Sequence, residues 1–381
     1  MSAPAISPTE DRYARQQLLH WWDQRRLREA RCLVVGAGAL GNEIIKNLAL
    51  LGAGHLTIVD LDVVERSNLA RCVLFREADE GRPKAEVAAR AARELNPEVA
   101  AEAVTDNVMT RGLGWLGDFD AVLAGLDNRE ARLWLNQGCR KLGRPWVDGA
   151  IEGLRGLVRV FGADGPCYEC TLGAVDRELL ARRRSCTLLS TEDLLAGKVP
   201  TTATSASVVA ALEVQEAVKL LHDRREAAAS GGRGLQLVGE TLEVHPVVYG
   251  EDPDCQAHDT YGDLEPWRYG QATTLAELFE AAAGSLPGPL VADLEDGIVV
   301  ARRCLACGTV GTEPRRLRAL APGEGRCPSC GEALQLDLRQ SVELHDPLAG
   351  MPLAELGLPD RDVVTVRGTA ARRHFELRRP A

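Results

Sequence analysis

The chain has 381 residues, of which 45% are hydrophobic, and this length predicts two or three domains with a sizeable core. Its net charge of −10 excludes a general nucleic-acid-binding protein, which needs a basic face. No apolar stretch approaches the roughly 20 residues that cross a membrane. From the charge we expect no nucleic acid as partner, and from the apolar stretches we expect no membrane.

The cysteine content indicates the cellular compartment. Residues 1–11 lack the basic and apolar pattern of a secretion signal. In a chain without such a signal, eleven cysteines predict metal ligands and reactive thiols in a reducing cytosol. We therefore expect a cytoplasmic protein, and the abundance of arginine and alanine hints at a bacterial origin.

The first 161 residues predict an α/β domain behind a helical arm. Residues 12–30 are expected to form a helix with an apolar stripe. From residue 31 to 161, apolar runs alternate with amphipathic segments, which predicts a parallel sheet flanked by helices. The expected strands are 32–35, 56–59, 101–104, 121–124, 146–147 and 157–161. The expected helices are 40–51, 85–95 and 129–142.

A glycine-rich turn follows the first predicted strand. Gly36, Gly38 and Gly41 fit the pattern G-x-G-x-x-G, in which glycines allow a tight turn and a close approach of backbone to ligand. The next helix would offer free N–H groups and a partial positive charge to a phosphate. Asp60 lies 19 residues after Gly41, where ribose hydroxyls are usually held. The turn predicts a nucleotide site, although dinucleotide dehydrogenases use the same device.

The residues after Asp60 favour a triphosphate over a dinucleotide. An acid, an amide and two cations follow in order: Asp62, Asn68, Arg71 and Lys84. Arg71 and Lys84 can neutralise phosphate oxygens, and Asp127, directly after the strand expected at 121–124, can hold Mg²⁺. Because parallel strands end at one edge of a sheet, Asp127 should face the same pocket as Asp60. Taken singly, the two cations would be solvated loop charges, and Asp127 with Asn128 a turn or helix cap.

Over roughly residues 12–260 the sequence resembles the family of ThiF, MoeB, HesA and the ubiquitin-activating enzymes. The matching motifs occur in family order: Arg12-Tyr13-Ala14-Arg15-Gln16, the Gly36–Gly41 turn, Asp60-Leu61-Asp62, Ser67-Asn68-Leu69-Ala70-Arg71, Arg82-Pro83-Lys84, Leu126-Asp127-Asn128 and Val147-Asp148-Gly149-Ala150. The resemblance implies a Rossmann-like, doubly wound and mostly parallel sheet, the adenylation fold. The family usually has a glutamine after the Arg71 position, where this chain has Cys72, a difference that bears on any glutamine contact to nucleotide or substrate.

The resemblance implies activation of a ubiquitin-like protein that ends in glycine. Its C-terminal carboxylate would attack the α-phosphate of ATP, giving an acyl-adenylate and pyrophosphate. Asp60 would hold the ribose and Asp127 the Mg²⁺, while Arg71, Lys84 and Arg15 would hold phosphates. In a homodimer, Arg15 would reach across the interface to the ATP of the partner. The expected nucleotide contacts are Gly36, Gly38, Gly41, Asp60, Asp62, Asn68, Arg71, Lys84, Asp127 and Asn128, with Asn68 orienting the triphosphate or the attacking tail.

A first metal site is predicted from residues far apart in the chain. Cys167 and Cys170 form a C-x-x-C pair, and Cys255 with His258 could complete a tetrahedral Cys₃His zinc site. Four protein ligands leave no open position, so this site would be structural. The family usually closes it with a second cysteine pair. A redox-active C-x-x-C is the alternative.

Cys186 is the candidate nucleophile. It has no C-x-x-C partner and follows three arginines, Arg182-Arg183-Arg184, which would stabilise its thiolate. The segment Cys186-Thr187-Leu188-Leu189 also resembles the catalytic Cys-Thr segment of ubiquitin- and SUMO-activating enzymes. That resemblance implies a thioester on Cys186, carried by a short loop of about residues 171–200, and transfer to a conjugating-enzyme cysteine. The alternative is a buried apolar cysteine.

The remaining chain predicts a helix, two strands and a zinc ribbon. The helix at 205–221 should receive N-cap hydroxyls from Thr201–Thr204, and strands are expected at 236–242 and 244–249. After a boundary near 259–269, we expect a helix at 274–283 and a strand at 363–366. Two C-x-x-C pairs separated by 19 residues predict a zinc ribbon; its ligands are Cys304, Cys307, Cys327 and Cys330. Two disulfides are the alternative and need an oxidising compartment.

Three domains and four functions follow. We expect an N-terminal helical arm at 1–30, an adenylation domain at 31–265, and a zinc-ribbon α+β domain at 266–381 that docks a partner. The leading function is activation of a ubiquitin-like protein with a thioester on Cys186. The second is adenylation of a sulfur carrier without an enzyme thioester. A non-catalytic nucleotide-binding scaffold and a nicotinamide oxidoreductase are further alternatives.

Overall fold

A computed structural model describes residues 11–173, 200–226, 228, 231–320 and 323–380. These residues form two compact units. Unit 1 comprises residues 11–108, 118–171 and 200–258, and unit 2 comprises residues 109–117, 172–173 and 259–380. None of the helices in these ranges has the length and apolar character that crossing a membrane requires.

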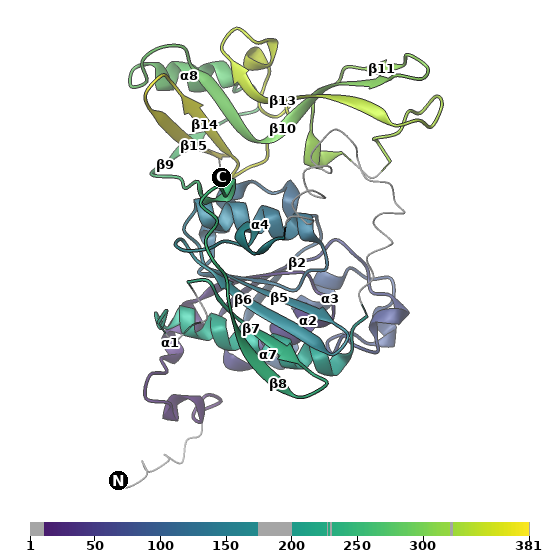
Figure 1. Ribbon diagram of the computed structural model, residues 1–381, viewed down its shortest axis with the longest axis vertical. Helices are drawn as coiled ribbons and strands as arrows, with labels where there is room; N and C mark the ends of the chain where they lie inside the picture. The colour runs from purple at the N-terminus through teal and green to yellow at the C-terminus, as the bar shows by residue number, and fades with distance from the viewer. Residues whose placement is uncertain (1–10, 174–199, 227, 229–230, 321–322, 381) are drawn as a thin grey trace. The chain divides into compact units, whose positions relative to one another are not determined.

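Unit 1 is built on an eight-stranded sheet in the order β3-β2-β1-β4-β5-β6-β7-β8. The first five strands of this order are parallel, and the remaining three are antiparallel. The predicted Rossmann-like, mostly parallel sheet is therefore confirmed (Figure 1). The strands are β1 Arg31–Val35, β2 His55–Val59, β3 Ala100–Val104, β4 Ala121–Ala124, β5 Trp146–Glu152, β6 Arg155–Phe161, β7 Arg233–Val238 and β8 Glu243–Val248.

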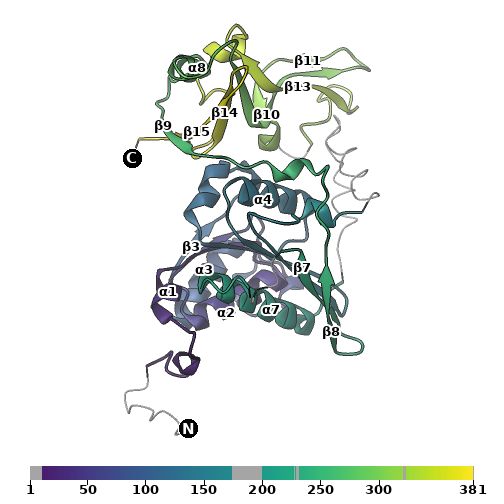
Figure 2. The same ribbon diagram turned by 60° about the vertical axis from the view of Figure 1, so that its left-hand side comes forward.

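Helices cover both faces of this sheet. In Figures 1 and 2, α4 lies on one face, and α2, α3 and α7 lie on the other. Ile44 and Leu48 of α2 are fully buried in the apolar core between these helices and the sheet. The helices are α1 Gln24–Glu29, α2 Ala39–Leu51, α3 Lys84–Leu95, α4 Arg129–Lys141 and α7 Ala203–Leu221. Short 3-10 helices are Gln16–Leu18, Arg66–Asn68, Glu77–Asp79, Glu169–Thr171 and Gln256–His258.

The start of α7 is fixed in two ways. Thr202 is the N-cap, and its Oγ1 accepts a hydrogen bond from the backbone N–H of Ser205 at 3.1 Å, as the hydroxyl-rich sequence predicts. Just before the cap, the Gly153 N–H donates to the carbonyl of Pro200 at 2.7 Å, and Gly153 forms an isolated parallel β-bridge with Thr201. The chain is thus joined to the β5–β6 turn where it enters α7.

The predicted single helix at 12–30 is wrong. The segment contains the 3-10 helix Gln16–Leu18 and then α1, which begins only after Asp23. The Asp23 side chain accepts from the backbone N–H of Arg25 at 3.0 Å and so starts a new helix. The connection between the two packs aromatic rings instead of continuing the helix, with Trp22 and His222 centroids 5.2 Å apart. Tertiary packing therefore overrides the local apolar stripe.

In its described residues, unit 2 combines a sheet with one α-helix, the expected α+β arrangement. Its sheet has the order β11-β10-β14-β15-β9, and β12 and β13 also pair with β10. The predicted helix and the predicted strand near 363 are present as α8 and β14. The elements are β9 Leu264–Arg268, α8 Leu275–Ala283, β10 Val291–Cys304, β11 Val310–Gly311, β12 Arg315–Arg316, β13 Leu334–Glu343, β14 Val363–Arg367 and β15 Arg372–Arg378, with 3-10 helices Leu317–Ala319 and Pro347–Gly350.

Candidate functional site

The glycine turn lies where β1, β2 and β4 end side by side. Gly36 has φ +93°, and a Cβ there would come 2.5 Å from the carbonyl oxygen of Gly125, which follows β4. A Cβ at Gly41 would overlap the carbonyl of Gly36. By contrast, a Cβ at Gly38 would meet nothing within 4 Å. The turn is therefore closed on the protein side and open at Gly38, the N-cap of α2, where an anion would meet helix N–H groups.

Asn42 fixes this turn from inside the protein, a role that the sequence did not indicate. Its side chain is fully buried. Its Nδ2 donates to the carbonyls of Ala37 at 2.6 Å and Gly38 at 3.1 Å, while its Oδ1 accepts from the backbone N–H of Leu74 at 2.9 Å. One amide thus holds the glycine turn against the loop that follows Arg71.

Asp60 joins the glycine turn to the loop after β2. Its two carboxylate oxygens accept from the backbone N–H of Ala37 at 2.6 Å and of Asp62 at 2.8 Å. Burial raises the pKa of Asp60, although both N–H groups and the charge of Lys84 act in the opposite direction. The carboxylate is therefore held in place at the edge of the sheet where the ribose is expected.

Lys84 and Asp62 form an ion pair next to Asp60. Lys84 Nζ lies 2.9 Å from Asp62 Oδ2, and the Lys84 side chain is only 12% exposed. Burial disfavours the ammonium, but Asp62 and Asp60 together outweigh it and raise the pKa of Lys84. Cys72 lies within electrostatic reach of both Lys84 and Asp60, and burial raises the pKa of its thiol to about 11. The predicted acids and cation are thus brought together, with a neutral thiol where the family has glutamine.

The other predicted phosphate ligands lie on connecting segments. Arg71 is half-buried, and its Nη1 donates to the carbonyl of Ser67 at 2.6 Å. Arg15 is exposed, at the N-cap of the 3-10 helix Gln16–Leu18. Two residues before it, Tyr13 is buried against Gly52, and its hydroxyl accepts from Asn96 Nδ2 at 2.8 Å. Tyr13 therefore anchors the segment that presents Arg15.

Two predicted amides have structural partners. Asn68 is buried, and its Oδ1 accepts from the backbone N–H of Glu65 at 2.9 Å, closing the turn Arg66–Asn68. Asn128 is the N-cap of α4, and its Oδ1 accepts from the backbone N–H of Glu130 at 2.7 Å. Asp127, just before this cap, is exposed. The predicted nucleophile Cys186 lies outside the described residues.

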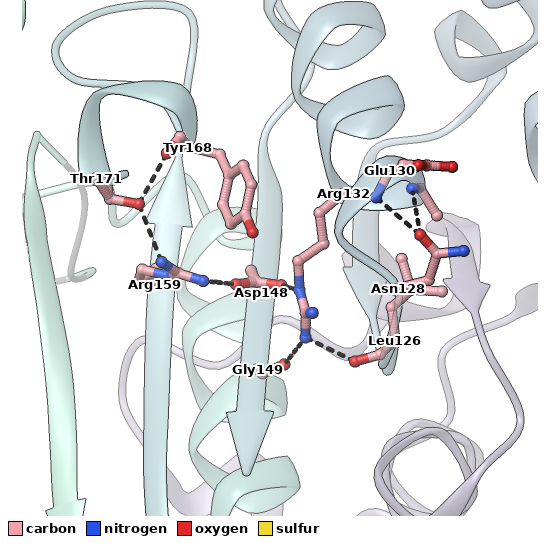
Figure 3. Close-up of polar contacts among 10 residues, drawn as sticks. Leu126, Asn128, Glu130, Arg132, Asp148, Gly149, Arg159, Tyr168 and Thr171 are labelled. Atoms are coloured by element: carbon pink, nitrogen blue, oxygen red, sulfur yellow. Dashed lines mark hydrogen bonds and ion pairs between the residues drawn. The ribbon is translucent and has the colours of Figure 1, made fainter. Parts of the chain in front are cut away.

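A buried charge network lies behind the Asp127 loop (Figure 3). Asp148 on β5 is fully buried and pairs with two guanidinium groups. Arg132 Nε on α4 donates to Asp148 Oδ1 at 2.6 Å, and Arg159 Nε on β6 donates to Asp148 Oδ2 at 3.1 Å. Arg132 Nη2 also donates to the carbonyls of Leu126 at 2.6 Å and Gly149 at 2.9 Å. The network thus contacts the backbone directly before Asp127.

Glu213 on α7 lies beneath the same network. It is fully buried, and a Cβ on Gly149 would overlap its carboxyl group. Burial, together with the nearby charge of Asp148, raises the pKa of Glu213 well above its usual value, while Arg132 acts in the opposite direction. Glu213 is therefore a buried carboxyl group packed against Gly149, next to the Asp148 carboxylate that contacts the two arginines.

The first predicted zinc site is assembled from unit 1 residues. The ligand atoms of Cys167, Cys170, Cys255 and His258 lie within 4.8 Å of one another. Cys167 Sγ lies 3.8 Å from Cys170 Sγ and 3.7 Å from Cys255 Sγ, close to the separation of about 3.8 Å expected for tetrahedral Zn–S bonds of about 2.3 Å. His258 directs Nε2 at Cys170 Sγ, and its Nδ1 lies 3.2 Å from Glu251, the outer carboxylate that often orients a histidine ligand. These donors fit zinc.

The zinc ribbon of unit 2 is assembled in the same way. Cys304 ends β10, and Cys327 and Cys330 precede β13. The Sγ atoms of Cys304 and Cys330 are 3.4 Å apart, and those of Cys307 and Cys327 are 3.5 Å apart. Against the effect of burial, the backbone N–H groups of Ser329 and Cys330 lower the pKa of Cys327 to about 6. The ten cysteines in the described ranges are free thiols, and this set of four fits a second zinc ion.

Comparison with known proteins places these features in a family. The chain matches the ThiF family over residues 11–257. It is 37% identical over 255 residues to the SAMP-activating enzyme E1 of Haloferax volcanii, which covers 64% of this chain and 87% of that protein. It is 40% identical over 170 residues to the sulfur carrier protein adenylyltransferase of Thermus thermophilus, which covers 42% of this chain and 63% of that protein. The chain thus spans less than two thirds of this second relative.

A solved structure shows the same fold. Escherichia coli MccB, crystallised with ATP, superposes with a TM-score of 0.54 at 23% identity, over 66% of this chain and 75% of MccB. At this identity the likeness concerns the fold alone. The family match, by contrast, includes the glycine turn, both residues of the Lys84–Asp62 pair and the Asp127 loop. The chain therefore belongs to the ThiF family.

Proposed function

We propose that this chain, an E1-like adenylyltransferase, activates the C-terminal carboxylate of a ubiquitin-like protein at the expense of ATP. One observation supports this proposal most directly. The glycine turn, the Asp60 carboxylate and the Lys84–Asp62 pair meet at one edge of the sheet, and the open position at Gly38 leaves room for phosphate. Relatives named as activating enzymes and adenylyltransferases add to it.

In the proposed reaction the carboxylate of the protein tail attacks the α-phosphate, and pyrophosphate leaves with its bonding electrons. Lys84 would exchange its ion pair with Asp62 for contacts to phosphate oxygens, which its ammonium can make with three donors. Arg71 and the N-terminus of α2 would neutralise further negative charge. Asp127 would hold the Mg²⁺ that accompanies ATP, and this ion would lower the negative charge of the phosphates.

The test is exchange of labelled pyrophosphate into ATP in the presence of candidate ubiquitin-like proteins that end in glycine. Removing one preorganised charge costs about 10²–10³ in rate, so Lys84→Met and Asp127→Asn should lower exchange by that factor. Lys219→Met is the matched control, because Lys219 pairs with Glu216 on α7, away from the turn. Absence of exchange by the unmodified chain with every candidate would contradict the proposal.

A second step is proposed at Cys186, from its three preceding arginines and its Cys-Thr segment. The acyl group would pass from the adenylate to the thiolate, releasing AMP, and then to the cysteine of a conjugating enzyme. The unmodified chain should form a thiol-sensitive adduct with the ubiquitin-like protein. Cys186→Ala should abolish this adduct, and Cys186→Ser should give an ester that resists thiols. A thiol-sensitive adduct that persists in Cys186→Ala would remove Cys186 from the mechanism.

The alternative is adenylation of a sulfur carrier protein. The 40% identity to the Thermus thermophilus sulfur carrier protein adenylyltransferase favours it. In that case the adenylate is consumed by a sulfur donor, and no enzyme thioester is needed. Full exchange activity and full transfer of sulfur in Cys186→Ala would support this alternative over conjugation.

The remaining parts of the chain have proposed structural and docking roles. The two cysteine-containing sites would hold structural Zn²⁺. Residues 31–265 would act as the adenylation domain and residues 266–381 as the docking domain for the conjugating enzyme. Residues 1–30 would form the arm that carries Arg15 across a homodimer interface.

A further inference from the structure

We propose that Asp148 is a positioning residue for adenylation. With Arg132 and Arg159 it connects the turn that carries Cys167 and Cys170 to the loop that carries Asp127. The proposal rests on the function proposed above, because Asp127 must act on the ATP–Mg²⁺ complex for its position to matter.

The first step concerns the Asp127 loop. Arg132 Nη2 holds the carbonyl of Leu126, the residue before Asp127, at 2.6 Å. On the other side of Asp127, the Asn128 side chain holds the first N–H groups of α4. Asp127 is therefore an exposed residue between two neighbours, Leu126 and Asn128, that both have hydrogen-bond partners. Asp148 holds Nε of the Arg132 guanidinium at 2.6 Å, and the Gly149 carbonyl accepts from its Nη2. Asp148 therefore helps to fix the group that binds the Leu126 carbonyl.

The second step concerns the strand pairing. Asp148 and Arg159 are directly opposite each other in the antiparallel pair β5–β6. Arg159 Nε and Nη2 both donate to Asp148 Oδ2, while Asp148 Oδ1 is left for Arg132. Each carboxylate oxygen thus has its own guanidinium. Charge-assisted hydrogen bonds arranged in this way fix geometry as well as charge.

The third step concerns the cysteine turn. Arg159 Nη1 donates to Thr171 Oγ1 at 3.0 Å, and Thr171 Oγ1 donates to the carbonyl of Tyr168 at 2.7 Å. The Arg159 guanidinium also stacks over the Tyr168 ring, 4.9 Å from its centroid. Tyr168 lies between Cys167 and Cys170, and Thr171 follows directly. A continuous chain of contacts therefore runs from this turn to the carbonyl before Asp127 (Figure 3).

The experiment measures pyrophosphate exchange with varied Mg²⁺–ATP. Asp148→Asn keeps the shape of the side chain and removes the charge that both arginines share. Loss of an outer partner that orients a ligand costs about tenfold, so we expect the KM for Mg²⁺–ATP to rise by about that factor. Glu240→Gln is the matched control, because Glu240 pairs with Arg155 at the exposed start of β6. The control should keep the unmodified KM.

A double-mutant cycle separates positioning from simple destabilisation. If Asp148 acts through Asp127, then Asp148→Asn in an Asp127→Asn background should add almost nothing to the loss of exchange. Additive effects, or an unchanged KM in Asp148→Asn, would overturn the proposal. If the unmodified chain shows no exchange at all, it is the proposed function that fails, so the two failures are distinguishable.

A milder change at Thr171, at the cysteine-turn end of this chain of contacts, tests the connection to the Asp127 loop. This test does not depend on whether Asp148 variants fold. Thr171→Val removes the hydroxyl, and Thr171→Ser restores it. In Thr171→Val we expect faster hydrogen–deuterium exchange of the backbone amides at 126–128, with recovery in Thr171→Ser. Identical amide exchange at 126–128 in Thr171→Val and the unmodified chain, each with its two zinc ions bound, would contradict the connection.

Discussion

At the scale of single residues, the glycines of the glycine turn differ in how well they tolerate an added side chain. A Cβ on Gly41 overlaps backbone that cannot move independently, whereas a Cβ on Gly38 projects into open space from ordinary backbone with φ −73°. Gly41→Ala should therefore destabilise the fold by several kcal/mol, on the order of the strain of an overpacked core. Gly38→Ala should change the free energy of unfolding by less than about 1 kcal/mol, the scale of an N-cap substitution.

The same pair of variants separates folding from nucleotide binding. In Gly38→Ala the new methyl group occupies the space that we assign to phosphate, so ATP affinity should fall while stability is retained. Chemical denaturation and ATP titration of both variants check this difference. Equal ATP affinity in Gly38→Ala and the unmodified chain would show that phosphate does not approach the turn there.

A second residue-scale prediction concerns pH. Asp362 in unit 2 is buried, and burial raises its pKa to about 6, while Arg316 acts in the opposite direction. Because the folded state binds this proton more tightly than the unfolded state, Asp362 stabilises the fold most below about pH 4, and this contribution is lost as the pH rises to about 6. The loss is about 3 kcal/mol for a shift of roughly two units.

Comparison of Asp362→Asn with the unmodified chain isolates this contribution. The difference in free energy of unfolding between the two proteins should shift in favour of the variant between pH 4 and pH 7. Denaturant titrations at four pH values measure it, and effects of pH on zinc are common to both proteins. If this difference in free energy of unfolding stays constant with pH, the raised pKa of Asp362 is contradicted.

At the scale of elements, we expect the proposed zinc ribbon to depend on its metal. The apolar cluster at the ends of β10 and β13 is small: Val299, Cys304, Cys327, Leu334 and Leu336. Two of its five members, Cys304 and Cys327, are themselves predicted zinc ligands. A segment with so little apolar burial is held by metal binding, which supplies folding free energy directly. The cysteine-containing end of β10 and the start of β13 should therefore lose order when zinc is removed.

Cys327→Ser tests this dependence. It should reduce bound zinc from two ions to one per chain and accelerate amide exchange at 304–334. Ser329→Ala is the matched control, because Ser329 lies between two ligands and is not one itself. Elemental analysis and hydrogen–deuterium exchange make the measurement. Two zinc ions per chain in Cys327→Ser would remove this cysteine from the ligand set.

The elements of unit 1 could be predicted well because their strands are buried apolar runs and their helices are amphipathic. The strand Ala121–Ala124 was predicted at its observed bounds. By contrast, β5 extends to Glu152, well beyond the predicted 146–147, because its second half pairs with β6 and is partly exposed. In unit 2, six strands were not predicted: β9, β10, β11, β12, β13 and β15. β15, for example, carries four charged residues among seven, and its pairing with β9 and β14 is set by distant sequence.

At the scale of the whole molecule, the proposed homodimer leads to a complementation experiment. A groove of about 290 Å³ on unit 1 is lined by Trp22, Leu50 and Leu51 of one side and by residues of α7 on the other. Leu18 and Leu19, next to Arg15 in sequence, are also exposed. A second copy that covers this apolar surface would bring the Arg15 arm of one protomer to its partner.

Taken alone, Arg15→Ala and Lys84→Met should each lower exchange by about 10²–10³. If Arg15 acts across the interface, mixed dimers contain one intact site, so a subunit-exchanged mixture should recover about a quarter of the unmodified activity. Activity of the mixture, together with native mass spectrometry to count mixed dimers, makes the measurement. No recovery in the presence of mixed dimers would place Arg15 in the site of its own chain.

The candidate nucleotide site could be recognised in the sequence only where its residues form local motifs. The glycine turn and Asp60 are linear motifs, and Lys84 follows them within one crossover. The role of Asn42 was missed, and Asp148 was noted only as part of a family motif without its contact to Arg159, because the role of a buried polar side chain is not evident until its partner is known. The partner of Asp148, for instance, is set by the register of β5 against β6.

The bridge between Gly153 and Thr201 has a kinetic consequence for the proposed thiol chemistry. The stretch that contains Cys186 is continuous at one end with the cysteine turn and at the other with Pro200, whose carbonyl is bound by Gly153. Both attachments belong to the protomer that carries the glycine turn. Transfer of an acyl group from a bound adenylate to that thiol would then be intramolecular, so its rate would not change when the protein is diluted. Transfer to a separate conjugating protein would be bimolecular, and its rate would fall in proportion to the concentration of that protein.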